Sequence, residues 1–262
     1  MARRRIILAL LITIAMGIGG AARAEFTPPP DYTAHYDLRK GPLTLGEAKL
    51  SFNRTDDSRY AYRMHTYPVG IASVFYGGEI HELSEGRITK SGFRPDHYVY
   101  HRTGDSHAKH AELHFDWSKG RVRNEVGDHP WSMKIPPGTL DRVFSPLQLM
   151  HDLSELNGRD TLTYRIADGG KLKTYHISVT GHEDVDTPAG RFDTVEVVRR
   201  SADGERVTRL WCAPALDYLA VKVEHSDEDD GTFDLVLTDL HGMSVPKSAR
   251  RGGRATPGLG HP

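Results

Sequence analysis

One short helical segment in a chain of strand-like segments is the feature that most limits the fold. Residues 145–158 carry it: Ser145 and Gln148 have the spacing of a capping box, and Pro146 falls at the first helical position, where its missing N–H costs nothing. Gly158 is suited to end the helix in a left-handed conformation. Apolar side chains recur on one helical face, which must therefore pack on strands. These are Leu149, Met150, Leu153 and Leu156.

Strand-like segments fill most of the remaining chain. Over residues 59–67, Tyr60, Tyr62 and Met64 alternate with mostly polar residues, as in a half-buried strand. In all, about a dozen such segments lie along the chain at hairpin spacing, without the helices that parallel strands need between them. We therefore predict a mainly β fold, an antiparallel barrel or strongly curved sheet with one short amphipathic helix that packs on its apolar face or closes one end.

Two segments are less regular. Residues 71–83 contain Gly77 and Gly78 and are predicted to be one strand with a bend. Pro130, Pro136 and Pro137 predict a loop leading to the helix.

The two ends of the chain differ in composition from its middle. Three arginines precede an apolar run, and Ala22-Arg23-Ala24 has the form of a cleavage site, so residues 1–24 are predicted to be a signal peptide. Residues 25–243 are predicted to form a single β-rich domain, because no Ser/Gly-rich linker divides them. Residues 244–262 are rich in glycine, proline and basic side chains and are predicted to be a disordered basic tail.

Charge and cysteine content limit the compartment and the partners. The chain has 34 basic and 35 acidic residues. Loss of residues 1–24 removes four arginines and leaves 30 basic against 35 acidic residues, a formal charge of −5. This charge lacks the basic footprint of nucleic-acid binding, so no nucleic acid is expected as a partner. Cys212 is the only cysteine, so no internal disulfide forms, and it is expected to be buried. We expect an exported protein, in a bacterial periplasm, with no transmembrane span after signal cleavage.

Histidines are concentrated between residues 97 and 114. If residues 108–115 form a strand, His110, Glu112 and His114 point to one face. Two imidazoles and a carboxylate can hold a catalytic zinc and leave a fourth position for water. The same side chains also suit an ordinary solvent-facing strand, and binding sites are usually concave. The metal site is therefore kept only as an alternative.

No motif in the mature chain assigns a catalytic residue or a cofactor. It has no phosphate-binding loop, dinucleotide fingerprint or nucleophile elbow. Aromatic side chains of the strands would suit the lining of an amphipathic cavity, or they fill the core. These are Tyr60, Tyr62, Phe75, Tyr76, Tyr98 and Tyr100.

A series of short motifs follows the strands in a fixed order. They are Gly92-Phe93-Arg94-Pro95, Phe115-Asp116-Trp117, Asp141 followed by Ser145-Pro146-Leu147, Thr187-Pro188-Ala189-Gly190-Arg191-Phe192, and Trp211 before Tyr218. In this order the chain resembles the exported proteobacterial family called domain of unknown function 3108, over roughly residues 32–240. The resemblance implies an exported β-rich domain without an established activity, and it transfers no catalytic residue.

Together these observations favour a non-catalytic envelope protein that binds an apolar or amphipathic ligand, such as a lipid, or an envelope partner in the concavity of the sheet. One alternative is a metal-dependent hydrolase that acts on envelope material through His110, Glu112 and His114. The other is a structural or assembly factor without a small ligand, which works through a sheet edge or the basic tail.

Overall fold

The computed structural model describes residues 26–75, 78–90, 92–104, 109–124, 130–156, 161–200, 206–228 and 231–245, together with residue 249. The predicted signal peptide lies outside these residues, as does most of the predicted tail. Within the tail, Ala249 is 4 % exposed, and its carbonyl lies close to Gly190.

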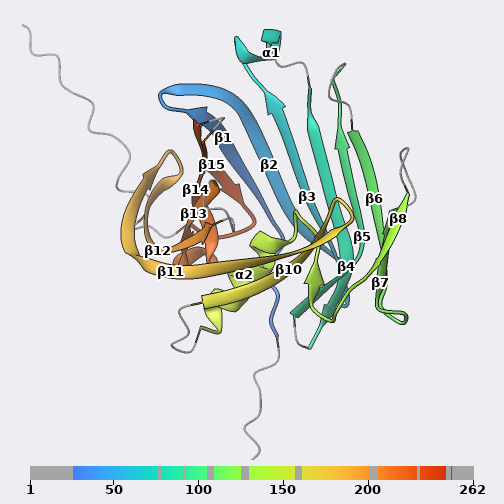
Figure 1. The fold of residues 1–262 in the computed structure, drawn as a ribbon. Coiled ribbons are helices and arrows are strands. Elements are labelled where there is room, and N and C mark those ends of the chain that lie inside the picture. The colour runs from blue at the N-terminus through green and yellow to red at the C-terminus, as the bar shows by residue number, and fades with distance from the viewer. Residues whose placement is uncertain are drawn as a thin grey trace, which may run out of the picture.

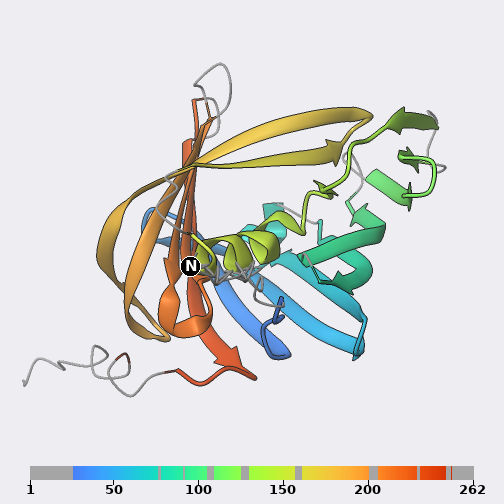
Figure 2. The same ribbon diagram turned by 90° about the horizontal axis from the view of Figure 1, so that it is seen from below.

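A single curved sheet of fifteen strands, counted over the described residues, wraps around helix α2 (Figures 1 and 2). The strand order is β8-β7-β6-β5-β4-β3-β2-β1-β15-β14-β13-β12-β11-β10-β9, so β1 and β15 pair in the middle and join two meanders. Neighbouring strands are antiparallel throughout the described chain, except for the short parallel pair β9–β10. The mainly β, antiparallel, strongly curved fold predicted from the sequence is thus confirmed, and the sheet is open between β8 and β9.

The strands of the first meander precede α2, and those of the second meander, apart from β9, follow it. The first set comprises β1 (Tyr32–Lys40), β2 (Leu43–Asp56), β3 (Arg59–Pro68), β4 (Ile80–Thr89), β5 (Gly92–Arg102), β6 (Lys109–Asp116), β7 (Arg121–Asn124) and β8 (Trp131–Lys134). The second comprises β9 (Thr139–Leu140), β10 (Thr161–Asp168), β11 (Lys171–Thr187), β12 (Gly190–Arg200), β13 (Arg206–Ala213), β14 (Leu219–Asp227) and β15 (Gly231–His241). The helical segments within the described residues are α1 (Ala72–Phe75), α2 (Ser145–Ser154) and the 3-10 turn η1 (Pro214–Leu216).

Two predicted segments differ from the structure. The strand predicted over residues 71–83 is wrong in its first part, because Ala72–Phe75 forms α1 and β4 begins only at Ile80. Gly70 has φ +57° and accepts hydrogen bonds from the Ser73 N–H and hydroxyl, which turns the chain into α1. The proline-rich loop before α2 contains the short strands β8 and β9. Their shortness leaves little free backbone at the two edges of the sheet.

The start of α2 does not use the predicted capping box. Neither Ser145 nor Gln148 makes a capping bond to the backbone at the helix N-terminus. Instead, the carboxylate of Asp141 accepts the N–H of Phe144 at 2.9 Å, which satisfies a donor at the entry to the first turn. The helix ends at Ser154, earlier than predicted. Its buried residues are Leu147, Leu149, Met150 and Leu153.

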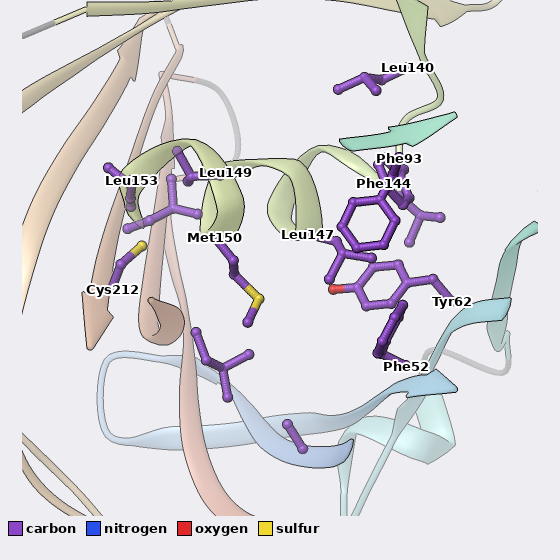
Figure 3. Close-up of a cluster of buried hydrophobic side chains, with 14 of the residues drawn as sticks. Phe52, Tyr62, Phe93, Leu140, Phe144, Leu147, Leu149, Met150, Leu153 and Cys212 are labelled. Carbon is purple, nitrogen blue, oxygen red and sulfur yellow. The ribbon is translucent and has the colours of Figure 1, made fainter. Parts of the chain in front are cut away.

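Aromatic rings from the first meander pack against the beginning of α2. The ring centroid of Phe144 lies 5.0 Å from that of Tyr60 and 5.2 Å from that of Phe93. In Figure 3, Phe144 and Leu147 point toward Tyr62 and Phe52. These contacts fix the helix inside the curve of the sheet, since ring pairs at such separations add to the burial of apolar surface.

Candidate functional site

A cavity of about 250 Å³ lies between α2 and the concave face of the sheet. Both meanders contribute its mainly apolar walls, and α2 adds Leu149 and Met150. The volume is slightly below the ~300–1,000 Å³ typical of small-molecule sites, so the cavity suits a slim ligand. The principal apolar lining residues from the strands are Tyr36, Leu50, Tyr62, Met64, Ile177, Leu210, Val223 and Leu235.

The predicted aromatic lining is only partly formed. Tyr60, Tyr98 and Tyr100 are buried but do not line this cavity, whereas Tyr62 does. The hydroxyl of Tyr62 has no hydrogen-bond partner among the described residues. The side chains of the other two predicted residues, Phe75 and Tyr76, lie outside the described part of the chain.

Arg199 of β12 places a positive charge in the cavity wall. Its Nη2 donates to Thr208 Oγ1 at 2.9 Å, and its guanidinium lies 4.6 Å from the centre of the Tyr175 ring. Among the described residues no carboxylate lies within ion-pair distance of Arg199. Burial lowers the pKa of Arg199 from its ordinary value. A guanidinium in this position is ready to pair with an anion, since its planar donors match a carboxylate or phosphate.

A second arginine of the wall is already neutralised. Arg142 Nε lies 3.3 Å from Glu82 Oε1, and the same oxygen accepts the hydroxyl of Tyr98 at 2.5 Å. The guanidinium of Arg142 also lies 4.7 Å from the centre of the Tyr100 ring. The charges of Arg142 and Glu82 therefore sum to zero, and Arg199 gives the cavity lining its net positive charge.

A buried carboxyl group lies beside this ion pair. Asp141 accepts the hydroxyl of Ser84 at 2.6 Å, and Ser84 in turn lies 3.3 Å from the hydroxyl of Tyr60. Burial raises the pKa of Asp141 from 3.8 to about 7. Asp141 connects β4 to the start of α2 and is therefore a structural group beside the cavity.

Cys212 also faces the cavity. It is buried, as expected from the sequence, and burial raises the pKa of its thiol to about 12. A thiol with such a pKa stays protonated and is a poor nucleophile, so Cys212 contributes apolar surface.

The outer face of the sheet, at β3 and the start of β4, carries a group of two histidines and a carboxylate. His65 of β3 lies directly opposite His81 of β4, and their stacked rings have centroids 4.0 Å apart. Both Nε2 atoms face Oε2 of Glu79, at 2.9 and 3.3 Å. Because side chains alternate along a strand, these residues point away from the cavity residues Met64 and Glu82.

A second group of the same composition lies on β5 and β6. His97 is opposite His114, with ring centroids 4.9 Å apart, and both Nε2 atoms face Oε1 of Glu112. The sequence predicts His110 in this group, but His110 lies opposite His101, at 5.6 Å between ring centroids. The structure therefore brings His97, in place of His110, to Glu112 and His114. The cross-strand partner depends on sheet register, which the alternation within one strand does not reveal.

The sequence matches the family described as "Protein of unknown function (DUF3108)" over residues 31–238. The chain belongs to this family. The match confirms the resemblance carried by the ordered motifs, and the family description names no activity. A search of curated proteins found no match.

Three solved structures are similar to the DUF3108 chain. A beta-barrel-like protein of domain of unknown function DUF1849 from Brucella abortus has 13% identity and a TM-score of 0.54, with 82% of this chain and 98% of that chain covered. This likeness supports the fold alone. A Bacteroides fragilis protein with a YmcC-like fold, described as a candidate exported protein, has 13% identity, 84% and 100% coverage and a TM-score of 0.27. A candidate lipoprotein from Parabacteroides distasonis has 11% identity, 83% and 99% coverage and a TM-score of 0.30.

The helices of the described residues are short. None of them has the length and apolar character needed to cross a membrane.

Proposed function

We propose that this DUF3108 protein is a non-catalytic envelope protein, exported to the periplasm, that binds an anionic amphipathic ligand in its cavity. One observation carries the proposal: a mainly apolar cavity whose wall contains Arg199, a guanidinium with no carboxylate partner among the described residues. In this arrangement a single acyl chain lies against Leu210 and Val223, and a carboxylate or phosphate head group pairs with Arg199.

The size and chemistry of the cavity set the expected affinity. Each buried methylene contributes about 0.8 kcal/mol, and a hydrogen bond between charged groups contributes ~1.5–3 kcal/mol. Lost ligand freedom offsets part of this gain. We therefore expect dissociation constants in the micromolar range, which correspond to about −8 kcal/mol.

Titration of the purified mature chain with a fluorescent fatty acid, cis-parinaric acid, tests the proposal. The substitution Arg199→Met keeps the length of the side chain but removes its charge, and is expected to weaken binding by roughly 10- to 100-fold. Arg200→Met is the matched control, since Arg200 is the exposed next residue and its loss changes the net charge equally. A fatty alcohol competes with the probe through its chain alone, so its affinity should be nearly the same in all three proteins.

Val223→Phe tests the place of the acyl chain. The larger side chain projects into the cavity and should lower the affinity for both the fatty acid and the fatty alcohol by about tenfold or more. Binding that is unchanged in Val223→Phe and in Arg199→Met would contradict the proposal.

Export has a separate test. Cleavage after Ala24 leaves Glu25 as the first residue of the mature chain, so N-terminal sequencing of the periplasmic protein should begin at Glu25. The single domain of residues 25–243 and the disordered tail of residues 244–262 stay predictions, and limited proteolysis that removes only the tail would support both.

A further inference from the structure

We propose that the outer face of strands β3–β6 binds two zinc ions, one in each histidine–carboxylate group. The first group is His65, Glu79 and His81, and the second is His97, Glu112 and His114. This inference goes beyond the proposed function, because it concerns the opposite face of the sheet and a different ligand.

The two groups repeat one geometry on two adjacent strand pairs. Each has a Glu-x-His segment with an apolar middle residue, which is Ile80 in the first group and Leu113 in the second. In each group a histidine of the preceding strand lies directly opposite the histidine of that segment. Since side chains two apart share a face and directly opposed Cβ atoms lie about 4.5–5.5 Å apart, this pattern gathers three side chains at one point.

The donor atoms are close enough to share an ion. In each group one atom from each of the three residues lies within 4.8 Å of the others. Zinc binds imidazole nitrogen and carboxylate oxygen at about 2.0–2.2 Å, so small side-chain rotations bring all three atoms to one ion. Two imidazoles and one carboxylate leave the fourth tetrahedral position for water.

Solvent reaches both groups. The side chains of the first group are 35–50 % exposed and those of the second 27–39 %. An ion can therefore enter without any opening of the fold.

The spacing of the groups predicts two ions rather than one shared ion. His97 belongs to the second group, and His101 lies opposite His81 of the first. His97 and His101 are four residues apart along β5, or about 13 Å at ~3.3 Å per residue. The two groups are separated by a similar distance, which is too far for one ion to bridge.

Zinc titration of the purified mature chain without a polyhistidine tag tests the inference. Metal analysis after equilibrium dialysis should give two zinc ions per chain, while magnesium is not retained. His81→Ala and His97→Ala should each lower the ratio to one, and the double variant should retain none. Cobalt offers a second readout, since its visible absorption reports a four-coordinate site and should halve in each single variant.

Two control variants sharpen the test. His182→Ala removes an exposed histidine outside both groups and should leave two ions bound. His110→Ala should also leave two, because His110 lies beside His101 rather than in a group. Retention of two ions by both His81→Ala and His97→Ala would overturn the inference, as would loss of an ion in His110→Ala but not in His97→Ala. If zinc binds but the fatty acid does not, the proposed function is contradicted and this inference is not. If the fatty acid binds but zinc does not, this inference is contradicted and the proposed function is not.

Discussion

The interior of this protein is filled differently by its two meanders. On the side of β2–β5, the rings of Phe52, Tyr60 and Phe93 pack against one another, and those of Tyr60 and Phe93 also pack against Phe144, with centroids 5.0–6.4 Å apart. On the side of β12–β15 the buried side chains are mainly aliphatic, as at Val197 and Leu237.

The cavity lies where these two kinds of core meet. Its walls combine Tyr36 and Tyr62 from the first meander with Leu210 and Val223 from the second. The large rings pack against Phe144 at the entry to α2, whereas the shorter aliphatic side chains leave room beside Met150. The aromatic side therefore holds the helix in place, and the aliphatic side provides much of the space for a ligand.

The largest predicted effect comes from the aromatic side. Phe144→Ala removes the ring that Tyr60 and Phe93 contact, and should lower the free energy of unfolding by about 3–5 kcal/mol. Leu210→Ala, on the cavity wall, should cost only about 2 kcal/mol, because Leu210 already borders empty space. Urea unfolding of both variants gives the two values. Equal losses would contradict the distinction between the two sides.

A pH-dependent effect comes next in size. Asp141 binds its proton more tightly in the folded chain, with a pKa of about 7, than in the unfolded chain, with a pKa near 3.8. Its contribution to stability is therefore complete below about pH 4 and is lost as the pH rises through 7, with a slope of at most ~1.4 kcal/mol per pH unit. Asp141→Asn cannot ionise, so its stability relative to the wild type should rise between pH 4 and 7. Urea unfolding at several pH values measures this difference. If the free energies of unfolding of the wild type and of Asp141→Asn change with pH in the same way, the proton on Asp141 does not contribute to stability.

The smallest effect compares two neighbouring valines of β14. Val223→Ile adds one methylene to the cavity and should raise the free energy of unfolding by up to ~0.8 kcal/mol. Val221 is fully buried and does not line the cavity, so Val221→Ile should instead cost about 1 kcal/mol or more through overpacking. Thermal unfolding can rank the two variants, and the same sign for both would mean that the space beside Val223 is not available.

Local sequence patterns predict most of this fold. Alternation of apolar and polar residues locates strands such as β3 and β14, and Pro146 followed by apolar residues at helical spacing locates α2. The pattern fails where the chain turns, as at α1, and where short strands such as β8 and β9 pair at the sheet edges. There the pairing depends on contacts with distant segments, which local propensity does not contain.

The candidate sites depend on contacts between distant segments and are therefore less predictable. The sequence indicates Glu112 and His114 as one face of a strand, but the partner His97 comes from the neighbouring strand and requires the register. Arg199 gives only a weak signal in the sequence, because a basic residue near a strand end is ordinary and only the structure places it in an apolar wall. A search for basic residues on the inward phase of otherwise apolar strands would have found it.

A crystal structure of the mature chain with a brominated fatty acid would show where the ligand binds. We predict a bromine peak in the anomalous map inside the cavity, near Met150 and Leu210, with the carboxylate of the ligand at the guanidinium of Arg199. A cavity without bromine at saturating ligand, or a ligand bound only on the outer face of the sheet, would contradict it.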